Sequence, residues 1–171
     1  MVAPSNIVTI SQSGSYYLTG DVYALDINAS DVTVDLNGFA VRHNGNFAFT
    51  IGGAGPINNV TIRNGSVLGP GVRTPTGSNP WEASYAGPNG FGLFVRNAAQ
   101  SVRLENLTVR GFPGGIICEG SNDTSGARLH VDNCIVRDCS SIGMWVRNAN
   151  KATYQVICLP LNWWTKSIPA T

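Results

Sequence analysis

The feature that most constrains this 171-residue chain is internal repetition. Four segments align without gaps, namely VTVDLNG from Val32, VTIRNGS from Val60, VRLENLT from Val102 and LHVDNCI from Leu129. Each opens with alternating apolar and polar residues, which predicts a β-strand. The segments recur about every 27 residues apart from one longer interval, and no helical periodicity separates them. The chain is therefore expected to be all-β.

A second set of similar segments lies between these strands. It comprises LFVRN from Leu93, IICEG from Ile116 and MWVRN from Met144, with FAFTI from Phe47 as a looser member. Short strands at a constant period are typical of stacked parallel strands, in which each turn covers the next about 4.8 Å away. We therefore predict a right-handed parallel β-helix, a single-stranded solenoid of about five to six turns. The competing architecture, an antiparallel sandwich or barrel, does not need self-similar segments of this length.

The longer interval holds an insertion over residues 69–90 that is rich in Gly, Pro and Ser. This composition disfavours a strand and predicts a long loop. We expect one domain over residues 1–171, with an atypical C-terminal tail at 157–171 where the repeat is lost. Equivalent residues of stacked turns form rows, and we predict that Asn64, Asn106 and Asn133 hydrogen-bond to one another along one row.

The opening VTISQSGSYYLTGDV, followed by INASDVTVDLNGFAV and NNVTIRNGSVLG, resembles the bacterial right-handed parallel β-helix repeat proteins of the pectate-lyase-like superfamily. The resemblance covers residues 7 to about 150. It implies a group that contains polysaccharide lyases, glycoside hydrolases and carbohydrate epimerases, beside many members with no assigned activity. The subgroup that this opening resembles is largely of the last kind and is usually exported, although the first residues lack the pattern of a signal peptide.

Composition argues against several functions. Lys and Arg number 11 against 10 Asp and Glu, so the net charge of +1 does not favour a nucleic-acid partner. No apolar run approaches the roughly 20 residues that span a bilayer. The four Cys and two His lack the spacing of a zinc site, and Cys118 and Cys134 are expected in the core. We expect no resident metal or cofactor, apart from a calcium ion that an acidic pair could hold.

Strand alternation places charged residues in two adjacent outward rows of the first set of strands. Two carboxylates on neighbouring turns must share a proton, bind a cation or separate, and such pairs serve glycosidic chemistry. The candidate catalytic residues, for a lyase or glycoside hydrolase acting on an acidic polysaccharide, are Glu105, Asp132, Arg103 and His130. The alternative is ordinary surface charge, which contributes little to stability.

The insertion supplies a candidate carbohydrate-binding site made of Trp81, Glu82 and Tyr85. Aromatic faces stack on sugar rings, and loops on a rigid scaffold commonly carry recognition. The alternative is that Trp81 folds back and covers the solenoid.

An apolar stripe is predicted on the outside of the second set of strands. Alternation turns Phe94, Ile117 and Trp145 outward beside charged neighbours. Large exposed apolar patches are rare on soluble monomers, so we expect a homo-oligomer interface here, with Trp163 and Trp164 of the tail as further members.

These features lead to three functional hypotheses. The preferred one is a non-catalytic β-helix module that binds carbohydrate or another protein along its side and self-associates. The second is a polysaccharide lyase or glycoside hydrolase, and the third is a structural or assembly solenoid. A groove with several close, mutually facing ionisable groups would favour the enzyme, and the sequence offers one modest candidate for it.

Overall fold

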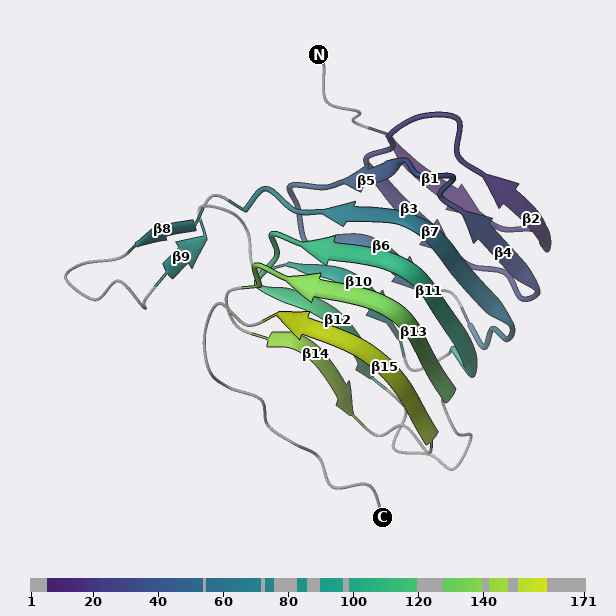
Figure 1. Cartoon of the computed structure of the whole chain (residues 1–171). Helices are drawn as coiled ribbons and strands as arrows, with labels where there is room; N and C mark the ends of the chain where they lie inside the picture. The colour runs from purple at the N-terminus through teal and green to yellow at the C-terminus, as the bar shows by residue number, and fades with distance from the viewer. Residues whose placement is uncertain are drawn as a thin grey trace.

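Two parallel β-sheets make up this protein, as the computed structural model shows (Figure 1). The structure describes residues 6–53, 55–71, 73–75, 83–85, 90–96, 99–119, 128–139, 142–147 and 151–159. Within those ranges the regular elements are all strands, which confirms the all-β expectation. The six-stranded sheet contains, in spatial order, β1 (Ile7–Ile10), β3 (Ala24–Ile27), β6 (Phe47–Ile51), β10 (Phe91–Val95), β12 (Gly114–Glu119) and β14 (Ile142–Arg147).

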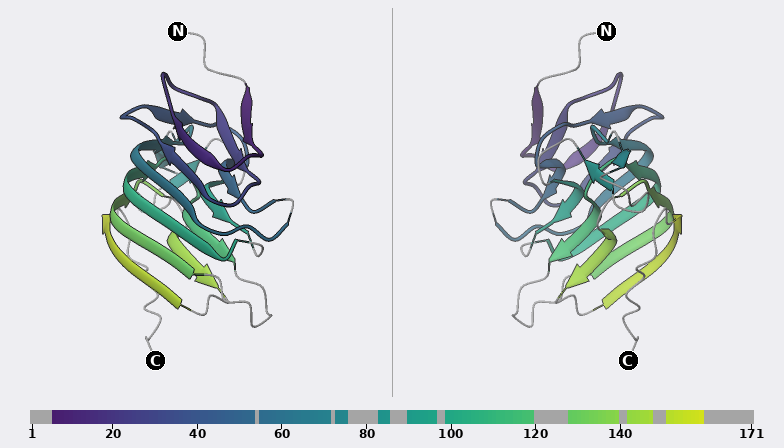
Figure 2. Two further views of the ribbon diagram at one scale, coloured as in Figure 1. Left: turned by 90° about the vertical axis from the view of Figure 1, so that its right-hand side faces the viewer. Right: turned by 90° about the vertical axis from the view of Figure 1, so that its left-hand side faces the viewer.

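The second sheet has seven strands and faces the first. In spatial order it contains β2 (Gly14–Tyr17), β4 (Val32–Asp35), β7 (Val60–Leu68), β11 (Ser101–Arg110), β13 (Arg128–Arg137) and β15 (Lys151–Leu159), with β5 (Ala40–Arg42) paired to β7. Apart from β5, which follows β4 in the same sheet, the chain passes alternately through the two sheets, so each strand pairs with one from an adjacent repeat. Figure 2 shows the resulting stack, with the purple N-terminal strands at one end and the yellow β15 at the other.

The register of the seven-stranded sheet is the predicted one. Val34 is level with Ile62, Ile62 with Leu104, and Leu104 with Val131. All four residues are buried, which confirms that this row faces inward. A one-residue slip would turn the whole row to solvent, so the hydrophobic pattern is what fixes this pairing.

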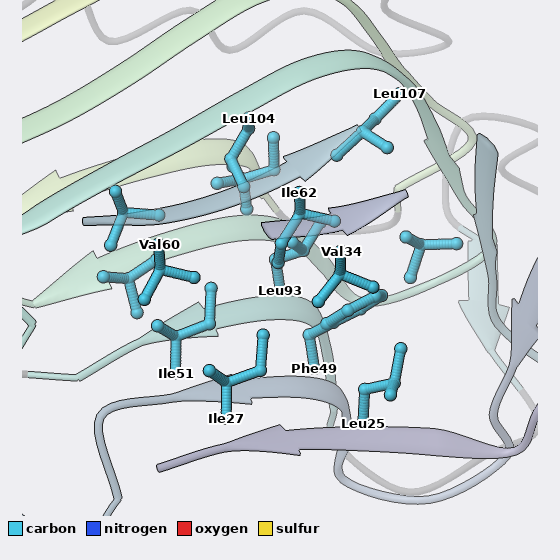
Figure 3. Close-up of a cluster of buried hydrophobic side chains, with 14 of the residues drawn as sticks. Leu25, Ile27, Val34, Phe49, Ile51, Val60, Ile62, Leu93, Leu104 and Leu107 are labelled. Atoms are coloured by element: carbon cyan, nitrogen blue, oxygen red, sulfur yellow. The ribbon is translucent and has the colours of Figure 1, made fainter. Parts of the chain in front are cut away.

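The core lies between the two sheets, where inward rows from both meet (Figure 3). Its labelled members are Leu25, Ile27, Val34, Phe49, Ile51, Val60, Ile62, Leu93, Leu104 and Leu107. Cys118 and Cys134 are buried in the same cluster and behave as small apolar residues, as expected.

An asparagine ladder runs along one edge of the core, as predicted. Asn133 Nδ2 donates to Asn106 Oδ1 at 2.7 Å, and Asn106 Nδ2 donates to Asn64 Oδ1 at 3.2 Å. Asn64 Nδ2 then donates to Asp35 Oδ2 at 3.0 Å, so the ladder ends on a carboxylate. The three asparagines have φ values of 61°, 52° and 47° along the chain. Asparagine tolerates this left-handed conformation better than most residues, so one residue type both bends the strand and joins neighbouring strands.

The insertion departs from the sequence expectation. It contains a short antiparallel hairpin of β8 (Arg73–Pro75) and β9 (Ala83–Tyr85), which projects away from the two sheets (Figure 1). The prediction that its composition disfavours any strand was wrong, because three paired residues on each side suffice for a hairpin. The strand-breaking residues are concentrated outside these two triplets.

The C-terminal boundary of the repeat also differs from the prediction. Parallel pairing continues through β15 to Leu159, with Ile157 level with Ile135 and Cys158 level with Val136. The repeat is therefore not lost at residue 157. The pairing is irregular between Val131 and Cys134, because β13 has two residues in this interval and β15 has only Gln155. β15 therefore has no asparagine at the ladder position.

Candidate functional site

Two strands of the six-stranded sheet, β6 and β10, share a pattern that turns two consecutive residues inward. In β6 and β10 the first and fourth residues are partly exposed, whereas the second, third and fifth are buried. The second residue is small, Ala48 in β6 and Gly92 in β10. A Cβ atom at Gly92 would lie 2.7 Å from Val109 Cγ1 in the core. Only a very small residue fits at the second position, and it lets the second and third residues both face the core. The first and fourth residues of each strand then lie on the outer face.

This pattern gathers three phenylalanine rings outside the sheet, here called the aromatic platform. Phe47 and Phe94 stack with ring centroids 4.9 Å apart and planes 17° apart. Phe91 lies 5.8 Å from Phe47 and 6.1 Å from Phe94 between centroids. The Arg96 guanidinium carbon lies 5.4 Å from the centroid of the Phe94 ring. Half-buried rings fixed by one another form a rigid apolar surface of the kind that stacks on flat ligands.

A cleft of about 590 Å³ adjoins the aromatic platform. Phe47 lines both, so platform and cleft form one continuous surface. Asp26 and Asn28 contribute from β3 and its end, His43 from the segment between β5 and β6, and Arg96 from the end of β10. Its volume lies within the range typical of small-molecule sites.

Three polar atoms in this cleft are buried without a hydrogen-bond partner. Asn28 Nδ2 donates to Asp26 Oδ2 at 2.9 Å, which leaves Oδ1 of each residue unpaired. The third such atom is Nδ1 of His43, a residue that is only 8% exposed. Buried polar atoms are nearly always paired, and an unpaired one costs about 1–3 kcal/mol. All three atoms belong to residues that line this cleft.

Two glycines keep the polar part of the cleft open. A Cβ atom at Gly53 would lie 3.0 Å from Asn28 Oδ1 and 3.7 Å from Asp26 Oδ1. A Cβ atom at Gly45 would lie 2.6 Å from His43 Nε2. A side chain at Gly53 would therefore meet the two unpaired oxygens, whereas a side chain at Gly45 would collide with the His43 ring.

Burial lowers the pKa of His43 below its ordinary value of 6.5, and a hydrogen bond to the Tyr23 main chain opposes the shift. The His43 ring packs against the Tyr23 ring with centroids 4.5 Å apart. The imidazole is accordingly neutral at pH 7. A neutral imidazole has one donor nitrogen and one acceptor nitrogen.

The predicted catalytic residues lie on the other sheet, away from this cleft. Arg103 is level with His130, and Glu105 is level with Asp132, as the row alignment predicts. Arg103 Nη1 lies 2.7 Å from Glu105 Oε1, so this carboxylate has a cation beside it. None of the four lines the cleft beside the aromatic platform. Their catalytic role stays a prediction.

A smaller cleft of about 280 Å³ lies on the seven-stranded sheet around Asp35. The main-chain N–H of Asn37, together with Asn64 and Arg63, holds the pKa of Asp35 below its usual value. Arg63 Nε lies 3.0 Å from Asp35 Oδ2. The carboxylate there is already satisfied by the protein, in contrast to the unpaired atoms of the larger cleft.

Most of the predicted binding residues of the insertion and tail lie outside the described residues. These are Trp81, Glu82, Trp163 and Trp164. Tyr85 ends β9, opposite Arg73.

The predicted apolar stripe is aligned as expected but is only partly exposed. Phe94 is level with Ile117, and Ile117 with Trp145. Trp145 is 37% exposed, but Ile117 is 1% exposed, so the expectation of an exposed Ile117 was wrong. Gly114 explains the difference, because the space where its Cβ would lie is 2.4 Å from the Phe91 ring and 3.5 Å from Ile117 Cδ1. The two side chains meet over this glycine.

Sequence reasoning missed Phe47 and Phe91 as outward residues. The sequence contained a signal for this pattern, because the second residue of each of the strands β6, β10 and β12 is small. These residues are Ala48, Gly92 and Gly115. The unpaired atoms of the cleft had no such signal. Asp26 and His43 belong to different segments, and only the folded sheet brings them together.

Among the described residues, no group of three or more His, Cys, Asp or Glu is close enough to share a metal ion. The same part of the chain contains no helix long and apolar enough to cross a membrane. Comparison with protein-family models, with curated protein sequences and with solved structures gave no match.

Proposed function

We propose that this chain is a non-catalytic β-helix module that binds carbohydrate along its side, through the aromatic platform and the adjoining cleft. The observation that carries the proposal is the contact between a stacked Phe47–Phe94 pair and a cleft whose lining includes the polar side chains of Asp26, Asn28 and Arg96. Sugars present an apolar ring face and a rim of hydroxyls, so they need this combination of surfaces.

The architecture we propose is the right-handed parallel β-helix of the pectate-lyase-like superfamily. The chain alternates between two parallel sheets, and an asparagine ladder joins successive turns. Parallel crossover connections within a sheet are almost always right-handed, which favours that hand. A side face built from stacked turns offers neighbouring subsites for an extended polymer.

A glycan array with the full chain tests the proposed function. We expect binding to at least one glycan class, and we expect Phe47→Ala and Phe94→Ala each to weaken it about tenfold through loss of stacking. Tyr17→Ala is the matched control, because Tyr17 is a 70% exposed aromatic residue on the seven-stranded sheet. Urea unfolding of each variant separates lost binding from lost folding.

The outcomes are distinct for the rival hypotheses. Equal affinity of the wild type and both phenylalanine variants would contradict the proposed site. Loss of binding in Trp81→Ala alone would instead locate recognition on the insertion. For the enzyme hypothesis, an absorbance assay for unsaturated uronate with oligogalacturonate would have to give a signal that Glu105→Gln abolishes.

A further inference from the structure

A pair of arginines lies on the outer face of the seven-stranded sheet, at the ends of β11 and β13. Arg110 and Arg137 are the last residues of these strands and are level with each other. Neighbouring strands lie about 4.8 Å apart. Because Val109 and Val136 are buried, alternation turns both arginines outward. We infer that this pair binds a tetrahedral oxyanion, the kind of group that a sulfate or phosphate ester supplies.

The protein itself does not neutralise this pair. Three other arginines of the sheet each form an ion pair with a carboxylate, namely Arg42 with Asp21, Arg63 with Asp35 and Arg103 with Glu105. Among the described residues, no such ion pair joins a carboxylate to Arg110 or Arg137. Like charges directly opposite each other on neighbouring strands destabilise a sheet, so a bound anion would relieve this repulsion.

The asparagine ladder separates the arginine pair from the acidic part of the outer face. On the N-terminal side of the ladder, the outward rows include Asp35, Glu105 and Asp132. On its C-terminal side, the outward residues of β7, β11 and β13 include no carboxylate; they are Ser66, Leu68, Thr108, Arg110, Ile135 and Arg137. Asp138 follows Arg137 directly, and the two arginines together with it still carry a net charge of +1.

The number of donors indicates which anion fits. A guanidinium is a planar fork of N–H donors without an acceptor, and one fork engages both oxygens of a carboxylate. Two forks side by side match a group with three free oxygens, as in a sulfate or phosphate ester. Thr108 and Ser66 are level with each other on the same face and add hydroxyl donors. The pair therefore fits a sulfated or phosphorylated ligand better than a uronate.

Calorimetric titration of the full chain with a chondroitin sulfate tetrasaccharide, and in parallel with its unsulfated counterpart, tests this site. Both ligands contain uronates, so the comparison isolates the sulfate ester. We expect the sulfated ligand to bind at least about tenfold more tightly. Arg110→Gln and Arg137→Gln should each remove this difference, since a single fork leaves sulfate oxygens unpaired. The matched control is Arg128→Gln, which removes an exposed arginine at the opposite end of β13 and should preserve the difference.

Two further measurements separate the site from folding and from the cleft. Urea unfolding without the anion should show no loss of stability in Arg110→Gln or Arg137→Gln, because each removes one of two like charges. Phe47→Ala should leave the preference for the sulfated ligand unchanged, since Phe47 belongs to the other sheet. Loss of this preference in Phe47→Ala but not in the arginine variants would place the sulfate in the cleft and overturn the proposal.

Inorganic sulfate and phosphate, titrated in the same way, identify the source of the oxyanion. Tight binding of either ion that both arginine variants abolish would support the site and make a free anion its ligand. Equal affinity for the two tetrasaccharides, without a response to either free ion, would overturn the proposal. An equal loss in Arg128→Gln would overturn it too, because it would mean general attraction to positive charge.

Discussion

At the scale of single residues, each ladder asparagine serves two purposes. Its left-handed backbone bends the long strand, and its amide joins that strand to its neighbour in the sheet. The direction is uniform, since every amide nitrogen donates toward the N-terminal neighbour until Asp35 accepts the last bond. A carboxylate at that end is a stronger acceptor than another amide, so it polarises the row favourably.

Substitution of Asn106 separates the two roles. Asn106→Ala loses the hydrogen bonds on both sides and must hold alanine at a φ of 52°, so we expect a loss of about 2 kcal/mol in unfolding free energy. Asn106→Gly loses the bonds but adopts this φ freely, and we expect a loss of about 1 kcal/mol. Urea unfolding measures both. Equal losses would mean that the backbone conformation contributes nothing.

His43 makes stability depend on pH near neutrality. Its pKa is lowered in the folded state, so the unfolded chain binds the proton more readily. The contribution is therefore complete above pH 6.5 and is lost as the pH falls from there through the folded-state pKa. We expect urea unfolding between pH 7 and pH 5 to show this decline, and His43→Gln to remove it. The control is His130→Gln, which replaces the other histidine. In this variant the unfolding free energy should still fall between pH 7 and pH 5.

At the scale of the strand, small residues decide the shape of the six-stranded sheet. Simple alternation predicts that neighbouring residues face opposite sides, and it correctly predicts the inward rows of β4, β7, β11 and β13. It fails at the corner of β6 and β10, where a small residue lets two neighbours point inward. Period-two patterning contains no information about such corners, so the aromatic platform could not be found from alternation alone.

Gly115 tests this account of the corner. A Cβ atom there would lie 2.4 Å from the Gly143 carbonyl oxygen and 2.5 Å from Val136 Cγ1. Because one of these atoms is backbone, Gly115→Ala must displace a neighbouring strand, and we expect a loss of about 1–3 kcal/mol. Gly20→Ala, with nothing within 4 Å, should change stability by less than about 0.5 kcal/mol. Urea unfolding measures both free energies. Similar losses in the two variants would refute the close packing at Gly115.

At the scale of the whole molecule, the repeat explains why the alignment of the strands could be predicted from the sequence and the cleft could not. Self-similar segments determine which residues are level with which, so the row of Glu105 and Asp132 could be aligned without a structure. The cleft depends instead on residues that break the repeat. His43 and Asn28 have no counterparts along the rows, and their approach follows from the path of the chain between strands.

Self-association remains the prediction that belongs to the assembled molecule. Trp145 is 37% exposed on β14, the last strand of the six-stranded sheet, and is continuous with Ile117 and Phe94 along one row. A second copy that covers only the Trp145 end of this row would bury the indole ring and leave the Phe47–Phe94 pair free, and a large aromatic side chain is a common energetic centre of an interface. Light scattering on the full chain should therefore give a homo-oligomer, and Trp145→Arg should give a folded monomer. Tyr17→Arg on the other sheet should leave the mass unchanged. A monomeric wild type would exclude this interface, and an oligomer that persists in Trp145→Arg would place the contact elsewhere.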